Sequence, residues 1–417
     1  MSEIKDYELK APYYIPDKLW TSPFNFDFAA SQPESVEIHD VTLRDGDQTP
    51  GVVFLEEDRV KIGRALNAMK VSRIEAGMPV VSTAIENAMR RMVAEKYDHS
   101  KIFAFARAVK RDVELSADIG VDGIIIEYLM NPTIIKAAYS ETQESLMDKL
   151  IPSINLAKDK GLYVSFMGWD WFRAPIEFTK WVVGELYNRT GLDGLVMVDT
   201  FGCTTPDAVA GMFKRFKDWF PRLRLEFHGH NDIGMANANA LAAVQNGADV
   251  VHGAMLGLGD RCGNTATEEL AAVFEMHKGI HTGIDCSRIY DTAMLVSELS
   301  GVKPYDSKPL LGSRPMLVEA GVGIDIGYKL QKADRSYTCF GTPVAPQTIG
   351  RNEKPRIVLG KNSGKSTIKL ALAEMGRTAD DAQVKTLLSM VVDEAMATKG
   401  LVSEDRFAEF VTDVCGT

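Results

Sequence analysis

Eight short apolar runs, separated by amphipathic helical patterns, constrain the fold of this chain of 417 residues more than any other feature. They cover residues 36–43, 73–79, 101–107, 123–129, 163–168, 194–200, 224–230 and 250–257. Helical spacing of apolar residues separates them, for example over 57–69, 207–216 and 235–246. Buried strands that alternate with helices are typical of parallel β/α units. Eight such units within about 220 residues predict an α/β fold, the closed (β/α)8 TIM barrel.

A doubly wound open sheet is the alternative to a barrel. Such sheets carry a G-x-G-x-x-G turn after a strand, and none of the eight runs is followed by one. We therefore expect a barrel over residues 36–285, preceded by an N-terminal arm, 1–35. Beyond residue 285, Gly- and Pro-containing stretches surround helical patterns at 366–375 and 382–396. These predict a smaller, mainly helical C-terminal region, 286–417.

Composition narrows the classes of partner and compartment. Asp and Glu number 57 against 47 Lys and Arg, a formal net charge of −10 at pH 7. This balance argues against nucleic acid, whose phosphates need a basic face. No segment approaches the roughly 20 apolar residues of a membrane span, and the N-terminus lacks the apolar core of a secretory signal. Five cysteines form no CxxC pair, so we expect a cytoplasmic protein with reduced thiols and no membrane partner.

Two strand ends carry side chains suited to a metal ion, and strand ends are where TIM barrels place catalytic residues. The seventh run ends in His-Gly-His, and Arg-Asp follows the first run. Residues i and i+2 of a strand point to the same side, so His228 and His230 can face one ion. Strands 7, 8 and 1 are contiguous in a closed barrel, which brings Asp45 nearby, and Asn264 can add a carbonyl oxygen. Such ligands suit divalent Mn²⁺, Mg²⁺, Fe²⁺ or Zn²⁺.

Four motifs in order along the chain carry a resemblance to a known family. They are Leu-Arg-Asp-Gly-Asp-Gln at 43–48, Asp-Thr-Phe-Gly at 199–202, His-Gly-His-Asn-Asp at 228–232 and Gly-Leu-Gly-Asp-Arg-Cys-Gly-Asn at 257–264. Together they resemble the DRE-TIM metallolyase superfamily, and within it the acetyl-CoA condensing branch of isopropylmalate, homocitrate and citramalate synthases. The segment Val-Leu-Gly-Lys-Asn-Ser-Gly-Lys at 358–365 is similar to one in the C-terminal subdomain of those synthases.

The resemblance implies a role for each matching residue. The implied ligands of a divalent metal are Asp45, His228, His230 and Asn264. The implied catalytic residues are Arg44, Glu75 and Asp260, and the implied substrate contacts come from Arg44, Gln48 and Thr200. A divalent ion that binds a 2-oxo acid polarises its ketone, and a guanidinium beside it stabilises the oxygen that becomes anionic. The alternatives are an ion pair of Arg44 with Asp45 or Asp47, and a packing role for Glu75 and Thr200.

The sequence departs from the synthases mainly where they handle the acyl-CoA. Their Lys-His-Ser-Gly reads Lys-Asn-Ser-Gly at 361–364, and a segment resembling their His-Glu-Ala-Gly-Ile-His reads Val-Glu-Ala-Gly-Val-Gly at 318–323. The replaced histidines are at Val318, Gly323 and Asn362, and an amide cannot act as a general base near neutral pH. Asp47 and Asp260 stand where the synthases usually have Glu. Ile134 lies in a stretch that lacks their Ser-x-x-His, which favours a more apolar pocket.

These features predict an acyltransferase that uses a divalent metal. It condenses acetyl-CoA, or another acyl-CoA, with a 2-oxo acid and gives a 2-hydroxy dicarboxylic acid and CoA. One alternative is a lyase that runs related aldol or Claisen chemistry as cleavage, which the replaced histidines favour. A non-catalytic paralogue is a further alternative, and the intact set of Arg44, Asp45, His228 and His230 argues against it. The resemblance also implies a homodimer.

Overall fold

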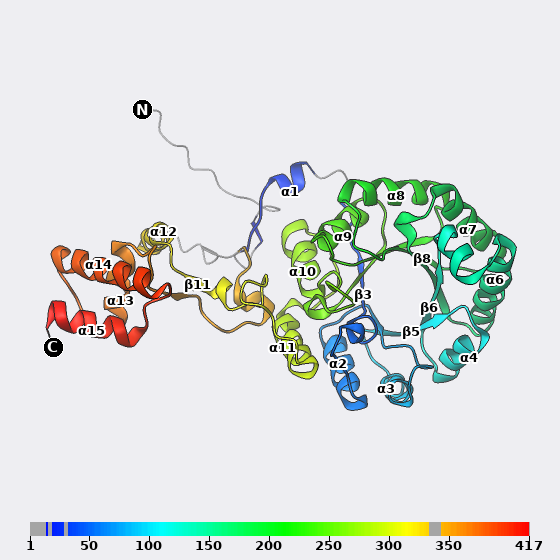
Figure 1. The fold of residues 1–417 in the computed structure, drawn as a ribbon, viewed down its shortest axis with the longest axis horizontal. Coiled ribbons are helices and arrows are strands. Elements are labelled where there is room, and N and C mark those ends of the chain that lie inside the picture. The colour runs from blue at the N-terminus through cyan, green and yellow to red at the C-terminus, as the bar shows by residue number, and fades with distance from the viewer. Residues whose placement is uncertain (1–13, 16–18, 29–31, 333–342, 417) are drawn as a thin grey trace. The chain divides into compact units, whose positions relative to one another are not determined.

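The computed structural model describes residues 14–15, 19–28, 32–332 and 343–416, drawn in colour in Figure 1. Of the expected N-terminal arm, residues 1–13, 16–18 and 29–31 lie outside the described residues. The chain divides into two compact units, one of residues 22–303 and one of residues 1–21 and 304–417. The first unit extends to residue 303, beyond the expected barrel end at 285. Helix α11 (Ile289–Ser300) belongs to this unit because it packs against helix α2 (Glu56–Ala68).

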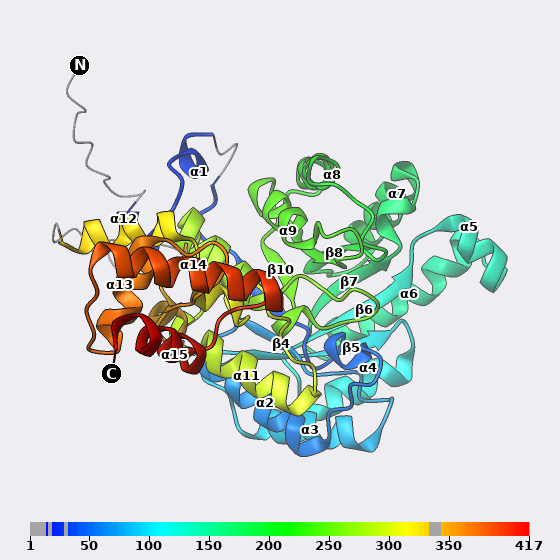
Figure 2. The same ribbon diagram turned by 60° about the vertical axis from the view of Figure 1, so that its left-hand side comes forward.

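The unit of residues 22–303 is a closed parallel barrel, which confirms the predicted fold class (Figures 1 and 2). Its strands follow one another in chain order, and the last, β10, pairs with the first, β3. The strands are β3 (Glu37–Asp40), β4 (Arg73–Glu75), β5 (Lys101–Arg107), β6 (Gly123–Leu129), β7 (Tyr163–Trp169), β8 (Gly194–Asp199), β9 (Arg224–Gly229) and β10 (Val250–Gly253). Each lies within or overlaps one of the eight predicted runs.

Helices surround the barrel strands on the outside in Figure 1. They include α3 (Thr83–Ala94), α4 (Lys110–Ile119), α6 (Gln143–Asp159), α7 (Ile176–Arg189), α8 (Pro206–Trp219), α9 (Ala236–Gln245) and α10 (Thr267–Ala271). Their apolar faces pack onto the strands. In α8, for example, Val209, Phe213 and Phe216 are buried at helical spacing, as the sequence pattern predicts.

The first barrel strand ends earlier than the predicted run 36–43, and this shortening positions the site. The backbone N–H of Thr42 donates to the Asp40 carboxylate at 3.0 Å, and the Thr267 hydroxyl donates to its other oxygen at 2.7 Å. The chain then turns, and the N–H groups of Arg44 and Asp45 donate to the carbonyl of Val41 at 3.0 and 2.9 Å. Arg44 and Asp45 are therefore held on a tight turn beyond β3, and not in the strand.

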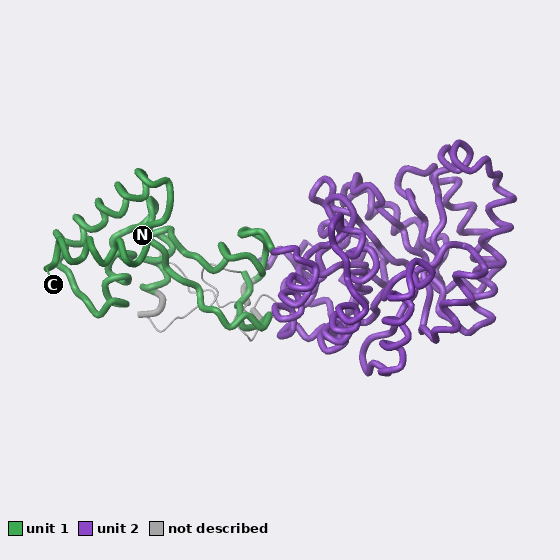
Figure 3. Tube along the Cα trace, turned by 60° about the horizontal axis from the view of Figure 1, so that its bottom comes forward, with its two compact units in different colours: residues 1–21, 304–417 green, residues 22–303 purple. Residues whose placement is uncertain are grey.

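The described part of the second unit is mainly helical, as predicted for the C-terminal region (Figure 3). Its elements are α12 (Gly321–Lys332), α13 (Lys365–Glu374), α14 (Asp381–Thr398), α15 (Glu404–Cys415), the parallel strands β11 (Leu317–Val318) and β12 (Arg356–Ile357), and the N-terminal antiparallel strands β1 (Tyr14–Ile15) and β2 (Leu19–Trp20). The sequence patterns predict α13 and α14 but miss α12 and α15. Within the described residues, no helix has the length and apolar character needed to cross a membrane.

Replacing Asp380 by Ala is expected to lower the free energy of unfolding by about 1 kcal/mol, the usual value of an N-cap. The Asp380 side chain accepts hydrogen bonds from the N–H groups of Ala382 and Gln383 at 2.9 and 2.8 Å, at the start of α14. Urea denaturation measures the change. Lys385→Ala, at an exposed position of the same helix, is the control and should change stability by less than about 0.5 kcal/mol.

Candidate active site

Three ionisable side chains meet at the C-terminal end of the barrel. Asp45 comes from the turn after β3, His228 from β9, and His230 follows β9 directly. The Nε2 atoms of His228 and His230 lie 3.4 and 3.8 Å from Asp45 Oδ2. All three side chains are buried, and their ligand atoms lie within 4.8 Å of one another. The structure therefore brings together the residues that the His-Gly-His and Arg-Asp motifs select.

Asn264 completes this group. Its backbone pairs with that of His230 in an isolated bridge. The Nδ2 of Asn264 donates to Asp45 Oδ1 at 2.9 Å and to the Leu258 carbonyl at 2.8 Å, while its buried Oδ1 has no partner among the described residues. Gly259 allows the close approach: at its φ of +153°, a Cβ would lie 2.2 Å from Asn264 Nδ2.

The protonation states of the group suit a metal ion. Burial raises the pKa of Asp45, but the charge of Arg44 and a hydrogen bond with His228 outweigh burial and hold it well below its usual range. Burial and the neighbouring His228 lower the pKa of His230 to about 4, and burial also lowers that of His228. At neutral pH the group thus offers a carboxylate and two neutral imidazoles, the forms that bind metals. With the free amide oxygen of Asn264, this donor set fits a divalent cation.

Arg44 lies beside the group and is oriented by two carboxylates. Its Nη1 donates to Asp45 Oδ2 at 2.8 Å, and its Nε donates to Glu75. The guanidinium also lies over the Phe105 ring, 4.4 Å from its centre. Its Nη2 has no hydrogen-bond partner among the described residues. Arg44 thus forms the ion pair with Asp45 that was the alternative to a catalytic role. This ion pair still leaves one NH₂ group of the guanidinium available to a ligand.

His39 supports Glu75 from within the barrel. Its Nε2 lies 2.9 Å from Glu75 Oε2, and its ring stacks on that of His252 at 4.3 Å between centres. Burial raises the pKa of Glu75, but Arg44 and His39 outweigh it and bring the pKa to about 2. His39 is not among the site residues that the sequence predicts. Strand alternation offers a signal for this role of His39. It places His39 together with the charged Glu37 on one side of β3, opposite to Ile38.

His39, Glu226 and His252 form a second buried group with ligand atoms within 4.8 Å of one another. The two imidazole planes are only 17° apart, so stacked rings of this kind cannot both hold one ion in their planes. Arg73 also pairs with Glu226 at 3.2 Å and neutralises it. We therefore regard this group as part of the polar core of the barrel.

The other predicted site residues have different surroundings. Thr200 is buried, and its Oγ1 accepts a hydrogen bond from the N–H of Asp170 at 2.8 Å. The Asp260 carboxylate is 49% exposed and pairs with Arg261 at 2.8 Å; only its backbone N–H reaches Asp45, at 3.4 Å. Gln48 is exposed, in the short 3-10 helix η1 (Gly46–Gln48). The side chain of Asp260 is thus not brought into the Asp45 group.

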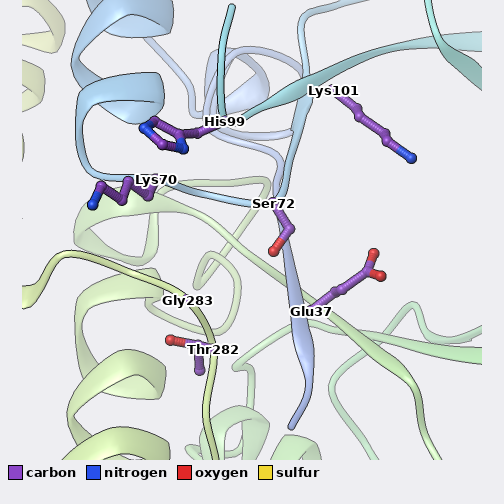
Figure 4. A pocket seen from close by; sticks show the side chains of 7 residues that line it. All are labelled: Glu37, Lys70, Ser72, His99, Lys101, Thr282 and Gly283. Carbon is purple, nitrogen blue, oxygen red and sulfur yellow. The ribbon is translucent and has the colours of Figure 1, made fainter.

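Two pockets lie at opposite ends of the strands. A cavity of about 680 Å³ is lined by residues at the C-terminal ends of β5, β6 and β7, including Glu127, which the sequence analysis missed. A smaller pocket of about 290 Å³ lies at the N-terminal ends of the strands (Figure 4). Its Glu37 is engaged by Arg73 and Arg224 at 2.8 and 2.9 Å. Catalysis in TIM barrels takes place at the C-terminal face, and the larger cavity lies on that face, as the candidate site does.

A comparison with known protein families assigns the barrel to a family. Residues 35–296, more than half of the chain, match the model of the HMGL-like family. The chain belongs to the HMGL-like family. The resemblance of its motifs to the DRE-TIM enzymes is thereby confirmed.

Curated relatives of this HMGL-like protein include condensing enzymes. A homocitrate synthase of Sulfolobus acidocaldarius is 33% identical over 359 residues, 85% of this chain and 74% of the relative. A "Probable 2-isopropylmalate synthase" of Ignicoccus hospitalis is 32% identical over 383 residues, 92% of this chain and 93% of the relative. Among solved structures, the HMG-CoA lyase of Bacillus subtilis superposes with a TM-score of 0.60 at 23% identity, covering 67% of this chain and 97% of the lyase. This last likeness concerns the barrel fold alone.

Proposed function

We propose that this HMGL-like protein is an acyltransferase that condenses acetyl-CoA, or another acyl-CoA, with a 2-oxo acid. The products are CoA and a 2-hydroxy dicarboxylic acid. The observation that carries the proposal is the buried group of Asp45, His228 and His230 with an oriented Arg44 beside it. It occurs in a chain about one third identical to a homocitrate synthase over 85% of its length.

A divalent metal held by Asp45, His228, His230 and Asn264 would supply a Lewis acid and a point of attachment for the 2-oxo acid. A base takes an α-proton from the acyl-CoA, and the α-carbon forms a bond with the ketone carbon as the ketone π bond breaks. The resulting alkoxide takes up a proton, and water then cleaves the C–S bond of the thioester to give a carboxylic acid and CoA. The ketone oxygen gains negative charge during bond formation, and the free Nη2 of Arg44 is the donor placed to stabilise it. Glu75, held by His39, keeps that guanidinium in place.

Thr200 is the second donor that we assign to the substrate. Its Oγ1 already accepts from the N–H of Asp170, so its own hydroxyl hydrogen remains available to an oxygen of the 2-oxo acid. We do not assign the removal of the α-proton to residue 362. Asn362 is exposed, and an amide is no base at neutral pH.

Cleavage of a related hydroxy acid or its CoA ester is the second candidate. The replacement of the synthase histidines by Val318, Gly323 and Asn362 favours it. Both reactions use the same metal and Arg44, so only the direction of turnover separates them.

We also propose a homodimer in the cytoplasm, on the similarity to the condensing synthases; light scattering coupled to gel filtration measures the mass.

Release of free thiol from acetyl-CoA tests the condensing function. The panel of acceptors is pyruvate, 2-oxoisovalerate, 2-oxoglutarate, oxaloacetate and glyoxylate, with Mn²⁺ or Mg²⁺ added. We expect thiol release that requires one of these acids, falls at least about a hundredfold with EDTA, and returns with added metal. Failure with the whole panel, while calorimetry shows bound Mn²⁺, would contradict condensation. Cleavage of 2-hydroxy dicarboxylic acids would then be measured.

A further inference from the structure

We infer that the acceptor is a 2-oxo acid with an uncharged, mainly apolar side chain, and that Glu127 excludes acceptors that carry a second carboxylate. The inference rests on the proposed function and names its substrate class. It follows from three observations on the cavity at the C-terminal ends of β5, β6 and β7: the nature of its walls, the pairing of its cations, and the position of one carboxyl group.

The cavity has the size and walls of a pocket for an apolar group. Its volume of about 680 Å³ is within the usual range for small-molecule sites. Apolar side chains make up much of the lining, among them Leu129, Ile134 and Trp169. Ile134 is the position at which the sequence already favours an apolar pocket. The cavity therefore has room for an apolar acceptor side chain, and Glu127 of its lining is an electrostatic neighbour of Arg44.

Both cations that line the cavity already have carboxylate partners. Arg107 forms two hydrogen bonds with Asp112, at 2.8 and 3.0 Å, and Lys149 pairs with Glu141. Specific recognition of a carboxylate normally uses an available guanidinium or ammonium group. Among the described lining residues, neither cation is available without breaking an existing ion pair.

Glu127 is the one charged group of the lining without such a partner. No described residue donates a hydrogen bond to it or forms an ion pair with it. It stands two residues after Ile125, which packs in the barrel interior with Phe105 and Met167. Strand alternation points Glu127 to the same inward side. Its electrostatic neighbours are Arg44, Asp45 and Glu75, so it faces the candidate site.

The charge of Glu127 decides which side chains the cavity accepts. Burial raises its pKa to about 7, although Arg44 opposes this, and Asp45 and Glu75 raise it further. At pH 8 the group is therefore mostly ionised. A second carboxylate in the cavity would meet a like charge and no free cation, which reduces binding at least about tenfold. An uncharged side chain meets the apolar walls without this like-charge repulsion.

The experiment compares acceptors of two classes at pH 8, with Mn²⁺ and the full chain. We expect kcat/KM in acetyl-CoA-dependent thiol release to be at least about tenfold higher for 2-oxoisovalerate and 2-oxoisocaproate than for 2-oxoglutarate and oxaloacetate. Glu127→Gln keeps the shape and removes the charge. This variant should lower the ratio of kcat/KM between the apolar and the dicarboxylic acceptors about tenfold. It should change kcat/KM for 2-oxoisovalerate itself by less than about threefold. Glu144→Gln, at an exposed position, is the matched control and should leave the preference unchanged.

Binding separates failure of this inference from failure of the proposed function. Calorimetric titration of 2-oxoisovalerate and of 2-oxoglutarate into the Mn²⁺-loaded protein needs no acyl-CoA and no turnover. Stronger binding of 2-oxoisovalerate than of 2-oxoglutarate, with the difference removed in Glu127→Gln because 2-oxoglutarate then binds more strongly, would support the pocket assignment even if thiol release fails. Equal or stronger binding of 2-oxoglutarate, a preference that Glu127→Gln leaves unchanged, or no binding of either acid would overturn it.

Discussion

Replacing His228 or His230 by Ala is expected to abolish metal-dependent thiol release and leave the barrel folded. Each imidazole faces Asp45 within 4 Å, so each variant removes one ligand from a group of four. Substitutions of residues that only support metal ligands already cost 10–100-fold in affinity or activity. Loss of a ligand itself should exceed that range. Titration with Mn²⁺ measures the affinity, and thiol release measures the turnover.

The control for these variants is His281→Ala, because the His281 side chain is 73% exposed. It should bind Mn²⁺ and turn over as the unmodified protein does. Circular dichroism and urea denaturation show whether each variant is folded. Full activity in the double variant His228→Ala/His230→Ala would remove the metal assignment from this end of the barrel.

The fold and the candidate metal-binding group could be predicted because they depend on periodicity and closure. Eight alternating units indicate a barrel, and a closed barrel makes the first, seventh and eighth strands neighbours. Closure therefore places His228 and His230 near the end of β3, and the turn after β3 carries Asp45 to them. Boundaries of elements were less predictable. β3 ends at Asp40 because its carboxylate binds Thr42 and Thr267, a contact between residues far apart in sequence.

Residues whose role depends on orientation within the barrel were missed. Glu127 stands in the apolar run 123–129 and reads as a strand residue. Its inward direction follows only once the structure shows that Ile125, two residues earlier, packs in the barrel interior. Asp260 differs from its predicted placement in the opposite sense. It lies in a motif of the site, but its carboxylate pairs with the adjacent Arg261, which adopts a left-handed φ of 55°. A local backbone conformation of that kind leaves no clear trace in the sequence.

Burial and charge explain why Arg44 is held so firmly. Asp45 and Glu75 occupy two of its nitrogen atoms, and Phe105 lies against its plane. Glu75 is fixed in turn by His39. The guanidinium therefore costs little reorganisation when negative charge appears at the ketone oxygen, which is the condition for strong electrostatic stabilisation. This arrangement requires three donor nitrogens in one plane.

Arg44→Lys should consequently lower kcat by about 10²–10³-fold, the usual effect of removing one oxyanion donor. A lysine keeps the positive charge but has no planar fork, so it cannot bind both carboxylates and also donate to substrate. Because the charge remains next to Asp45, the affinity for Mn²⁺ should change less than about tenfold. Arg64→Lys, at a side chain 52% exposed, is the control. An unchanged kcat/KM in Arg44→Lys would mean that Arg44 serves only as the ion-pair partner of Asp45 and Glu75.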